Sequence, residues 1–366
     1  MTPPSEVDSL SAAPGADCRV SIAVPVHNGA HHLAETLTSI LEQTHAALEI
    51  VVIDDNSSDG SVEVAERFAQ RDSRVNVLHN ELNLGMVGNW NRAVSVCSGR
   101  WIHLTGQDDL LAPTAIEIML SAVTDESRLV MAARRFSFEA NCPRPLRRAY
   151  TWELPTLETL GVPSGVVTPA AAARLVSRLP SPCTNFLGEP VCGLIRHDIF
   201  KDRGPFNEGL SQLADYEFWL RCVLQEPFVH VAQPLFRFRV HGGSATQTNL
   251  ADRVQGVHLE YARLLLELLE GERFSEARQL HPALVELWEE SLLNEVVILQ
   301  KFARCDAQAA ATIQDAAGGH PGLARRINQP VSLQQRLQNI LAAARIQIRR
   351  LGSASLGRHL GPRAGR

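Results

Sequence analysis

The sequence predicts an α/β protein built on a largely parallel, doubly wound sheet. In the first hundred residues, short apolar runs typical of buried strands alternate with segments of helical spacing, and the connections are short. A polar cluster follows each strand-like run. Ligands of open α/β sheets bind beyond the carboxyl ends of the strands, so four polar strand ends on one edge predict a binding site.

The expected elements follow one another in a regular order. Helix 31–43 has apolar residues at a spacing that gives one buried face, and helices 61–71 and 89–97 follow the same rule. Strands are expected at residues 19–26, 49–53, 75–78 and 101–104. The polar clusters at their ends are His27-Asn28, Asp55 to Asp59, Asn83 to Gly85 and Asp108-Asp109.

Composition excludes several classes of protein. The chain has 366 residues, of which 45% are hydrophobic and 20% charged, as in an ordinary globular protein. Its seven cysteines are scattered without CxxC spacing, which argues against a disulfide framework and a structural zinc site and suits a reducing compartment. Residues 1–18 lack the features of a signal peptide, and no apolar run reaches the length of a membrane span. The expected location is cytoplasmic.

The pair Asp108-Asp109 is the strongest single signal for chemistry. Two adjacent carboxylates at a strand end repel each other, and a divalent cation bound between them and a phosphate relieves that repulsion. The alternative is a solvated acidic turn before a helix. Fingerprint loops of the forms GxGxxG and GxxxxGK[ST] are absent, which argues against the usual dinucleotide and P-loop sites.

Together these motifs resemble the family 2 glycosyltransferases, which bind nucleotide sugars on a GT-A fold. The resemblance covers about 100 consecutive residues. It implies a Rossmann-like, mostly parallel central sheet with flanking helices. The matching segments are VSIAVPVHNG (20–29), SILEQT (39–44), EIVVIDDNSSDGS (49–61), NLGMVGNWNRAV (83–94) and SGRWIHLTGQDDLLAP (98–113).

The resemblance implies roles for the donor-side residues. Asp55 would accept a hydrogen bond from the ring N–H of a pyrimidine, and His27 would stack on the base unless it is an unpartnered loop histidine. Asp108 would contact the sugar or ribose, and Asp109 would hold Mg²⁺ or Mn²⁺ between the two phosphates. Gln107 stands where many relatives carry a third acid. The donor-side set is Pro25, His27, Asn28, Asp55, Ser57, Asp59, Asn83, Gly85, Asn91 and Asp108.

The second half of the chain supplies candidates for the acceptor side. Asp215 begins a helix, where an acid serves as a cap or first-turn charge, but the resemblance implies that it is the general base, with Glu217 as the alternative. Glu189 could bind acceptor hydroxyls or be a buried structural carboxylate. His241 is expected either as a further cation ligand or as a structural histidine, followed by a glycine-rich lid.

The predicted organisation is a flexible tail (1–18), a GT-A domain (19–250) and a helical extension (251–366). The GT-A domain would comprise a nucleotide-sugar half (19–125) and an acceptor half (126–250). Residues 325–366 carry nine arginines and no acid, so the net charge of −5 leaves −14 on the remainder, since −5 − 9 = −14.

Segment 332–351 predicts an amphipathic helix that bears arginines. It could contact an anionic membrane surface, or it could pack on the domain or on a second subunit. Nucleic acid is not expected as a partner, because the interleaved aromatic residues of stacking surfaces are missing.

The predicted function is transfer of one sugar per encounter, with inversion, to a glycan or lipid-linked acceptor in cell-envelope polysaccharide synthesis. A UDP-sugar is the favoured donor. A processive-synthase motif (Gln-x-x-Arg-Trp) is absent. One alternative is a sugar nucleotidyltransferase, which would need a glycine-rich phosphate loop that PVHNGAHH does not supply. The other is a catalytically inactive binding module, against which the joint presence of Asp55, Asp109, Asp215 and His241 counts. The enzyme would be cytoplasmic, with peripheral contact at the inner face of the membrane if segment 332–351 binds lipid.

Overall fold

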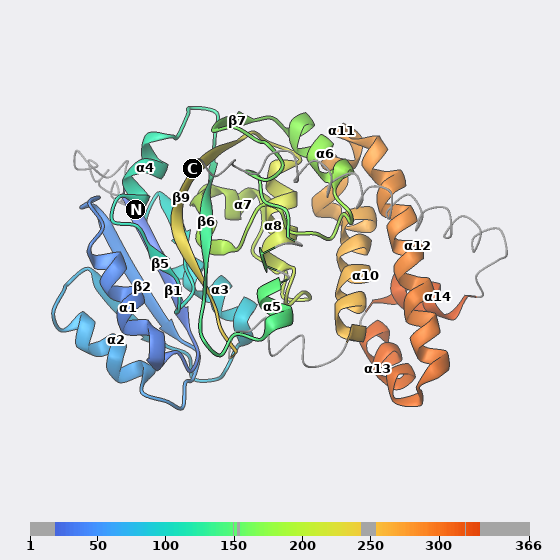
Figure 1. The fold of residues 1–366 in the computed structure, drawn as a ribbon, viewed down its shortest axis with the longest axis horizontal. Helices are drawn as coiled ribbons and strands as arrows, with labels where there is room; N and C mark the ends of the chain where they lie inside the picture. Colours follow the sequence, from blue (N-terminus) through green and yellow to red (C-terminus); the bar gives the residue numbers. More distant parts are fainter. Residues whose placement is uncertain (1–18, 149, 152–153, 243–253, 319, 330–366) are drawn as a thin grey trace, which may run out of the picture.

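The computed structural model describes residues 19–148, 150–151, 154–242, 254–318 and 320–329. Within them, helices flank a central sheet of nine strands, and a group of helices packs along one side (Figure 1). The strand order is β3-β2-β1-β4-β8-β6-β9-β5, with β7 paired to β9. The predicted α/β fold with a C-terminal helical region is confirmed.

The first half of the sheet is wholly parallel. Its strands pair in the order β3-β2-β1-β4. Strands β1, β2 and β4 are almost entirely buried because helices cover the sheet, whereas the edge strand β3 is mostly exposed or half-buried. Asn28 and Asn56, in the loops after β1 and β2, have φ values of 51° and 58°, which asparagine tolerates better than most residues. The elements are β1 (Val20–Val26), α1 (Ala30–Leu41), β2 (Leu48–Asp54), α2 (Ser61–Ala69), β3 (Val75–His79), α3 (Gly85–Val96) and β4 (Trp101–Leu104).

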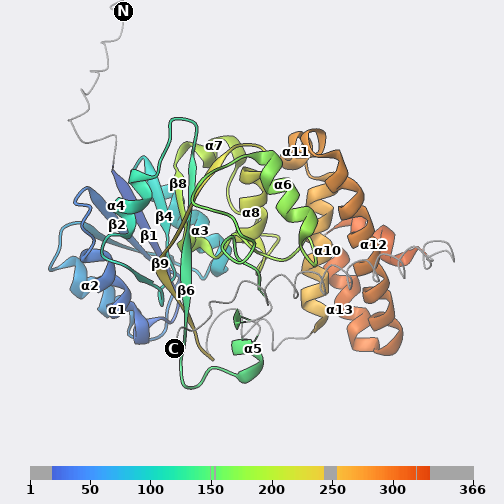
Figure 2. The same ribbon diagram turned by 45° about the horizontal axis from the view of Figure 1, so that its top comes forward.

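The second half of the sheet is mixed. The prediction of parallel strands holds for β1 to β4 and for the pair β6–β9, whereas the other four pairings are antiparallel. Figure 2 shows β6 and β9 side by side, with the short helix α5 near their lower ends. That helix lies in a basic, proline-containing segment, NCPRPLRR (141–148). The strands are β5 (Leu110–Leu111), β6 (Leu129–Phe138), β7 (Gly165–Val167), β8 (Gly193–Arg196) and β9 (Phe228–Val240).

Helix α8 is the most buried helix element of this half: all ten of its residues are buried. A helix that is enclosed on every side needs no polar face. The sequence of α8, ADYEFWLRCV, is accordingly mostly apolar, apart from its two acids and its arginine. Helix α6 begins after Thr168, whose hydroxyl accepts the N–H of Ala171 as an N-cap. The helices are α4 (Ala115–Ser121), α5 (Arg144–Arg148), α6 (Pro169–Arg178), α7 (Asp198–Arg203) and α8 (Ala214–Val223), with the 3-10 turn η3 (Pro190–Cys192).

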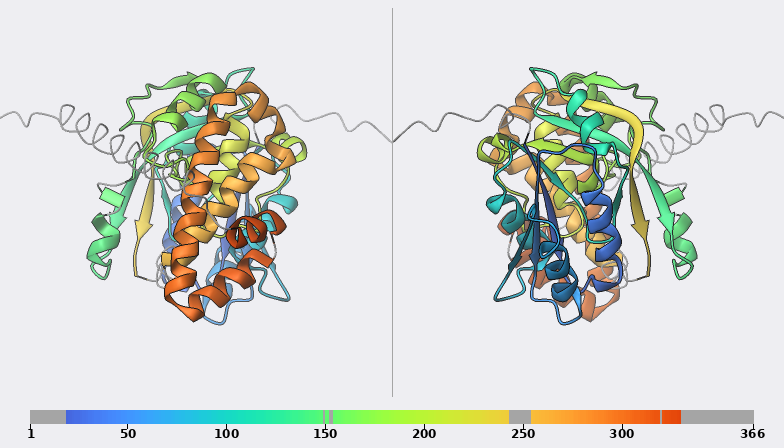
Figure 3. Two further views of the ribbon diagram at one scale, coloured as in Figure 1. Left: turned by 90° about the vertical axis from the view of Figure 1, so that its right-hand side faces the viewer. Right: turned by 90° about the vertical axis from the view of Figure 1, so that its left-hand side faces the viewer.

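The C-terminal helices form a layer on the side opposite the parallel strands (Figure 3). They share one hydrophobic core with the central sheet and the helices that cover it. None of the helices in the described ranges is long and apolar enough to cross a membrane. The predicted tail (1–18), most of the glycine-rich lid and segment 332–351 lie outside the described residues. The elements are α10 (Val254–Glu270), η4 (Glu272–Phe274), α11 (Ser275–Leu280), α12 (Pro282–Cys305), α13 (Ala307–Gly318) and α14 (Pro321–Asn328).

Candidate active site

The register of the parallel strands brings the predicted donor-side loops together. Val26 pairs with Asp54, and Asp54 pairs with His79, so the loops after β1, β2 and β3 begin side by side. The last β1–β4 pair is Ala23 with Leu104. Pro25 lies beyond that pair, where the N–H it lacks is not needed by β4. The four polar strand ends therefore meet at one edge, as the sequence indicates.

Asp55 is held rigidly at this edge. It is 1% exposed, and its Oδ1 accepts hydrogen bonds from Asn80 Nδ2 and from the Leu84 N–H, each 2.8 Å long. Asn89 supports the same strand end by donating to the Ile53 carbonyl at 3.1 Å. The sequence analysis does not include Asn80 or Asn89 among the site residues. Asn80 could have been predicted, because it directly follows β3 and polar residues at strand ends mark this site.

His27 lies exposed in the loop after β1. Its Nδ1 lies 2.9 Å from the Asp55 carbonyl, and Asn83 Nδ2 lies 3.2 Å from the same nitrogen. Gln107 fixes the backbone of this loop, because its Oε1 accepts the His27 N–H at 2.8 Å and its Nε2 donates to the His27 carbonyl at 3.1 Å. An acid at position 107 could accept the first bond but could not donate the second.

Three of the predicted nucleotide-binding residues tie the first two loops to each other. Ser57 Oγ accepts the Asn28 N–H at 2.9 Å, and Asn28 Oδ1 accepts the Ser58 N–H at 2.8 Å. Asp59 Oδ2 accepts the N–H of Ala30, the first residue of α1, at 3.1 Å. Burial opposes ionisation of Asp59, but its hydrogen bonds to Ser61 and these backbone groups lower its pKa overall. These hydrogen bonds hold the loops after β1 and β2 in a fixed position relative to each other.

Three further predicted donor-side residues lie just before or on α3: Asn83, Gly85 and Asn91. Asn83 Oδ1 accepts the Gly85 N–H at 2.9 Å, and Gly85 adopts a φ of 76°, a value that favours glycine. Asn91 contacts a distant segment. Its amide donates to the Phe206 carbonyl at 3.0 Å and to Glu208 at 2.9 Å, and its Oδ1 accepts the Phe206 N–H. Asn91 therefore joins α3 to the loop before α8, and its contact with the nucleotide stays a prediction.

The carboxylates of Asp108 and Asp109 converge at Gly106. A Cβ on Gly106 would lie 2.8 Å from Asp108 Oδ1 and 2.9 Å from Asp109 Oδ2, so glycine leaves the space beside these oxygens open. Asp109 is 3% exposed, and Oδ1 accepts the Arg239 N–H at 3.1 Å. Burial, followed by the neighbouring charge of Asp108, raises the pKa of Asp109 well above its ordinary value. A divalent cation fits this pair, because its charge would favour the ionised form of both acids.

His241 contacts Asp108. Its Nε2 lies 2.9 Å from Asp108 Oδ2, and this hydrogen bond is the main reason that the His241 pKa is raised. The Arg239 side chain donates to the Asp108 carbonyl at 2.9 Å, so the end of β9 is hydrogen-bonded to the loop that carries the two acids. His241 thus lies beside the acidic pair, as predicted. Its coordination of a cation stays a prediction.

A second set of polar side chains surrounds Asp215 at the start of α8. Asp215 is 7% exposed, and Asn185 Nδ2 donates to its Oδ2 at 3.2 Å. Glu189 forms an ion pair with Arg134 on β6, whose side chain is only 4% exposed. Burial, and then the charge of Glu189, raises the pKa of Asp215 to about 8. Asn185 and Arg134 were not predicted as site residues.

Asn185 also orders the loop that precedes η3. Its Oδ1 accepts the N–H groups of Leu187 and Gly188, and its Nδ2 donates to the Gly188 carbonyl at 3.1 Å. Trp219 on α8 donates its indole N–H to the same Gly188 carbonyl at 2.9 Å. One asparagine thus links the loop carrying Glu189 to the helix carrying Asp215.

Glu217 does not match its predicted acceptor-side role. Its side chain is 1% exposed and forms an ion pair with Arg221, one helical turn further on, at 2.7 Å. Burial raises the pKa of Glu217, and the Arg221 charge opposes that rise. The sequence marks position 217 as close to the base, but helix α8 turns this side chain into the protein interior.

The helical extension holds the loop that leads into α8. Glu260 on α10 accepts the N–H of Gln212 at 2.8 Å and that of Ser211. His281, before α12, has Nε2 2.8 Å from the Leu224 carbonyl at the other end of α8. Both ends of the helix that carries Asp215 are therefore tied to the extension.

Comparison with known proteins agrees with this fold. A model of glycosyl transferase family 2 matches residues 21–176. An uncharacterized glycosyltransferase of Haemophilus influenzae is 33% identical over 254 residues, which cover 66% of this chain and 73% of that protein. The crystal structure of S. aureus TarS 1–349 in complex with UDP-GlcNAc superimposes with a TM-score of 0.55 at 16% identity, covering 91% of this chain and 92% of that one.

A shorter match carries a more specific name. The UDP-Glc:alpha-D-GlcNAc-diphosphoundecaprenol beta-1,3-glucosyltransferase WfgD of Escherichia coli is 36% identical over 105 residues, which cover 29% of this chain and 41% of WfgD. The match thus spans less than half of that relative. The chain belongs to glycosyl transferase family 2, with a GT-A fold, and it is a glycosyltransferase.

Proposed function

We propose that this glycosyltransferase moves a sugar from a nucleotide-sugar donor, with a UDP-sugar favoured, to a hydroxyl of a glycan or lipid-linked acceptor. WfgD is named for a UDP-glucose donor and a diphosphoundecaprenol acceptor, and TarS was crystallised with UDP-GlcNAc, which supports this choice of donor. The observation that carries the proposal is geometric: the carboxylate oxygens of Asp108 and Asp109 lie side by side at Gly106, beyond the end of β4, at the edge of the sheet that also holds Asp55. The charge of Glu189 raises the pKa of both Asp109 and Asp215.

The donor nucleotide is assigned to the edge formed by the loops after β1, β2 and β3. Both hydrogen bonds that the described residues make to the Asp55 carboxylate go to Oδ1, and we assign Oδ2 to the ring N–H of the pyrimidine. The exposed imidazole of His27 lies next to Asp55 and is assigned to the face of the base. Gln107 serves this function indirectly, by holding the His27 backbone in place.

The donor diphosphate is assigned to Asp108 and Asp109 with a divalent cation, Mg²⁺ or Mn²⁺. Hard cations of this kind prefer oxygen ligands, and Asp108 Oδ1 and Asp109 Oδ2 are the two carboxylate oxygens beside Gly106. When bound, the cation would stabilise the negative charge of the departing nucleoside diphosphate. The backbone N–H of Arg239 keeps the Asp109 carboxylate oriented toward this position.

Asp215 is assigned as the general base. It would take the proton from the acceptor hydroxyl that attacks the anomeric carbon from the face opposite the departing diphosphate, which inverts the configuration. A pKa of about 8 suits a base that must accept a proton near neutral pH. Asn185 would orient the carboxylate through its hydrogen bond to Oδ2.

The test compares Asp215→Asn with Asp125→Asn, an exposed acid outside the site, as a matched control. Release of UDP from UDP-glucose and UDP-GlcNAc, with water or added glycans as acceptor, is measured alongside UDP affinity in the presence of Mn²⁺. We expect D215N to lose at least about a hundredfold in rate while UDP affinity stays within twofold, and D125N to match the parent enzyme. A D215N variant of normal activity would refute the assignment of the base.

The lipid-linked acceptor and the membrane contact remain proposals. Segment 332–351, on which the membrane prediction depends, lies outside the described residues. Synthesis of a cell-envelope polysaccharide, in the cytoplasm at the inner face of the membrane, would follow if the acceptor carries an undecaprenyl-type lipid. Co-sedimentation with anionic vesicles, with and without residues 332–366, tests this part separately.

A further inference from the structure

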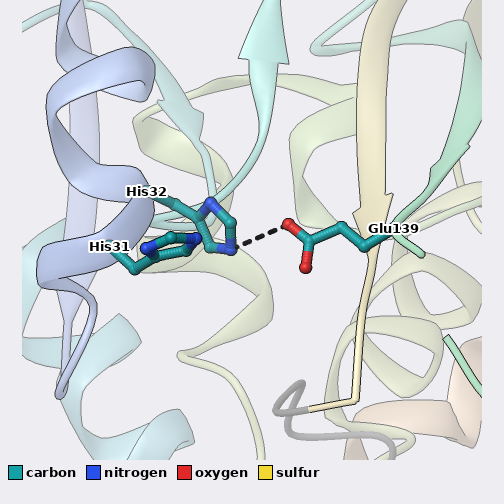
Figure 4. A group of neighbouring side chains, drawn as sticks. All are labelled: His31, His32 and Glu139. Carbon is teal, nitrogen blue, oxygen red and sulfur yellow. Dashed lines mark ion pairs between the residues drawn. The ribbon is translucent and has the colours of Figure 1, made fainter. Parts of the chain in front are cut away.

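Two histidines and a glutamate come together beside the donor side of the site. His31 and His32 lie in the first turn of α1, and Glu139 follows the end of β6. Figure 4 shows the three side chains gathered between α1 and the end of β6, with His32 pointing at the Glu139 carboxylate. More than a hundred residues separate the two parts of the cluster in sequence, so only the fold brings them together.

The distances suit a shared ion. One ligand atom from each residue can be chosen so that all three lie within 4.8 Å of one another. His32 Nε2 is already 3.2 Å from Glu139 Oε1, a separation similar to that between two ligands of one tetrahedral metal ion. The rings of His31 and His32 are 4.4 Å apart. His31 is exposed, so its side chain is free of packing that would prevent a rotation toward a common ion.

The surroundings of the ligands also suit a metal. His32 is 8% exposed, so its imidazole is held beside Glu139 and away from bulk water. The contacts of the Glu139 carboxylate with His32 and with Arg239 Nη1, the latter at 3.9 Å, both go to Oε1.

The ligand set distinguishes this cluster from the Asp108–Asp109 pair. Two imidazoles and one carboxylate form the ligand set of many zinc sites, whereas an all-carboxylate pair favours Mg²⁺ or Mn²⁺. The two positions are nevertheless neighbours, because the His32 ring is 5.0 Å from the ring of His241, which contacts Asp108.

We propose that His31, His32 and Glu139 bind one zinc ion, with the fourth coordination position open to water. The ion would tie α1, in the parallel half of the sheet, to the end of strand β6 in the mixed half. It would therefore stabilise the folded chain and hold in place the segment that faces His241 and Asp108. This site does not depend on the proposed transfer reaction.

The test measures zinc binding by the full chain after removal of metals with a chelator. Isothermal titration with ZnCl₂ is compared for the parent, His31→Gln, Glu139→Gln, the exposed control His79→Gln, and Asp109→Asn, which alters only the Mg²⁺ or Mn²⁺ position. Circular dichroism checks that each variant is folded. H31Q serves as the safest ligand variant because His31 is exposed.

We expect one zinc ion per chain, an affinity lowered at least tenfold in H31Q and E139Q, and no change in H79Q or D109N. Zinc should also raise the Tm of the parent and not that of E139Q, because an ion that binds only the folded state stabilises it. Three results would overturn the proposal: no stoichiometric zinc binding, equal losses in H31Q and H79Q, or loss of zinc binding in D109N. The first two would leave the transferase function untouched.

Discussion

The ionisation of Asp215 should control how the transfer rate depends on pH. Burial and the charge of Glu189 raise the pKa of Asp215 to about 8. A general base works only when ionised, so the rate should rise with pH and level off above about pH 8. With this pKa, about one tenth of the enzyme is active at pH 7 and about nine tenths at pH 9, which predicts a roughly tenfold increase between them.

Substituting Glu189 by glutamine should move this rising limb to lower pH. The change removes the like charge that raises the Asp215 pKa, and it releases Arg134, whose charge already lowers that pKa. Both effects lower the pKa of Asp215. A shift of about one unit, typical for loss of a nearby charge, would bring about half of the enzyme into the active form at pH 7. E189Q should then work at about half of its own high-pH plateau, compared with one tenth for the parent.

The assay is the initial rate of nucleoside diphosphate release between pH 6 and 9, at saturating Mg²⁺ and donor. Each variant is normalised to its own plateau, so that any contact of Glu189 with the acceptor does not distort the comparison. D125N serves as a control with an unchanged profile. A profile that is flat from pH 6 to 9, or a limb that moves upward in E189Q, would refute the role assigned to Asp215 and the effect assigned to Glu189.

Three further substitutions test other contacts. Asn185→Ala removes a hydrogen bond to the ionised form of Asp215, worth about 1.5–3 kcal/mol, and should lower kcat about ten- to a hundredfold with little change in donor KM. Glu260→Ala leaves two backbone N–H groups of the loop before α8 without their acceptor, and should cost about 1–3 kcal/mol of unfolding free energy in a urea titration. Glu217→Ala strands the buried charge of Arg221 and should cost about 3–5 kcal/mol in the same titration. A stable E217A enzyme with an impaired acceptor KM would instead restore the acceptor role for Glu217.

The parallel half of the sheet could be predicted because its signals are local. Each strand is a short apolar run followed by polar residues, and register then aligns the polar ends without further information. The position of Asp55 and of the Asp108–Asp109 loop follows from that alignment. The role of Asp109 as a cation ligand is a prediction that the family resemblance implies.

Other features depend on contacts between distant segments, which one sequence does not reveal. The pairing of β6 with β9 includes register shifts near Ala132 and Ala133, and it brings Arg239 to the acidic loop. Asn91 has the same residue type as a nucleotide ligand, but its partner lies 115 residues away at Phe206. Glu217 could be placed only once both sides of α8 were known to be covered.

We propose that the Asp108–Asp109 loop binds the donor nucleotide through a divalent cation. Calorimetric titration with UDP, dTDP and GDP, each with and without Mn²⁺, tests it directly for the parent enzyme and Asp109→Asn. We predict that UDP binds the parent with Mn²⁺ and that its affinity falls at least tenfold when either Mn²⁺ or the Asp109 carboxylate is removed. Failure of all three nucleotides to bind under any condition, or UDP binding that is indifferent to both Mn²⁺ and Asp109, would contradict the account.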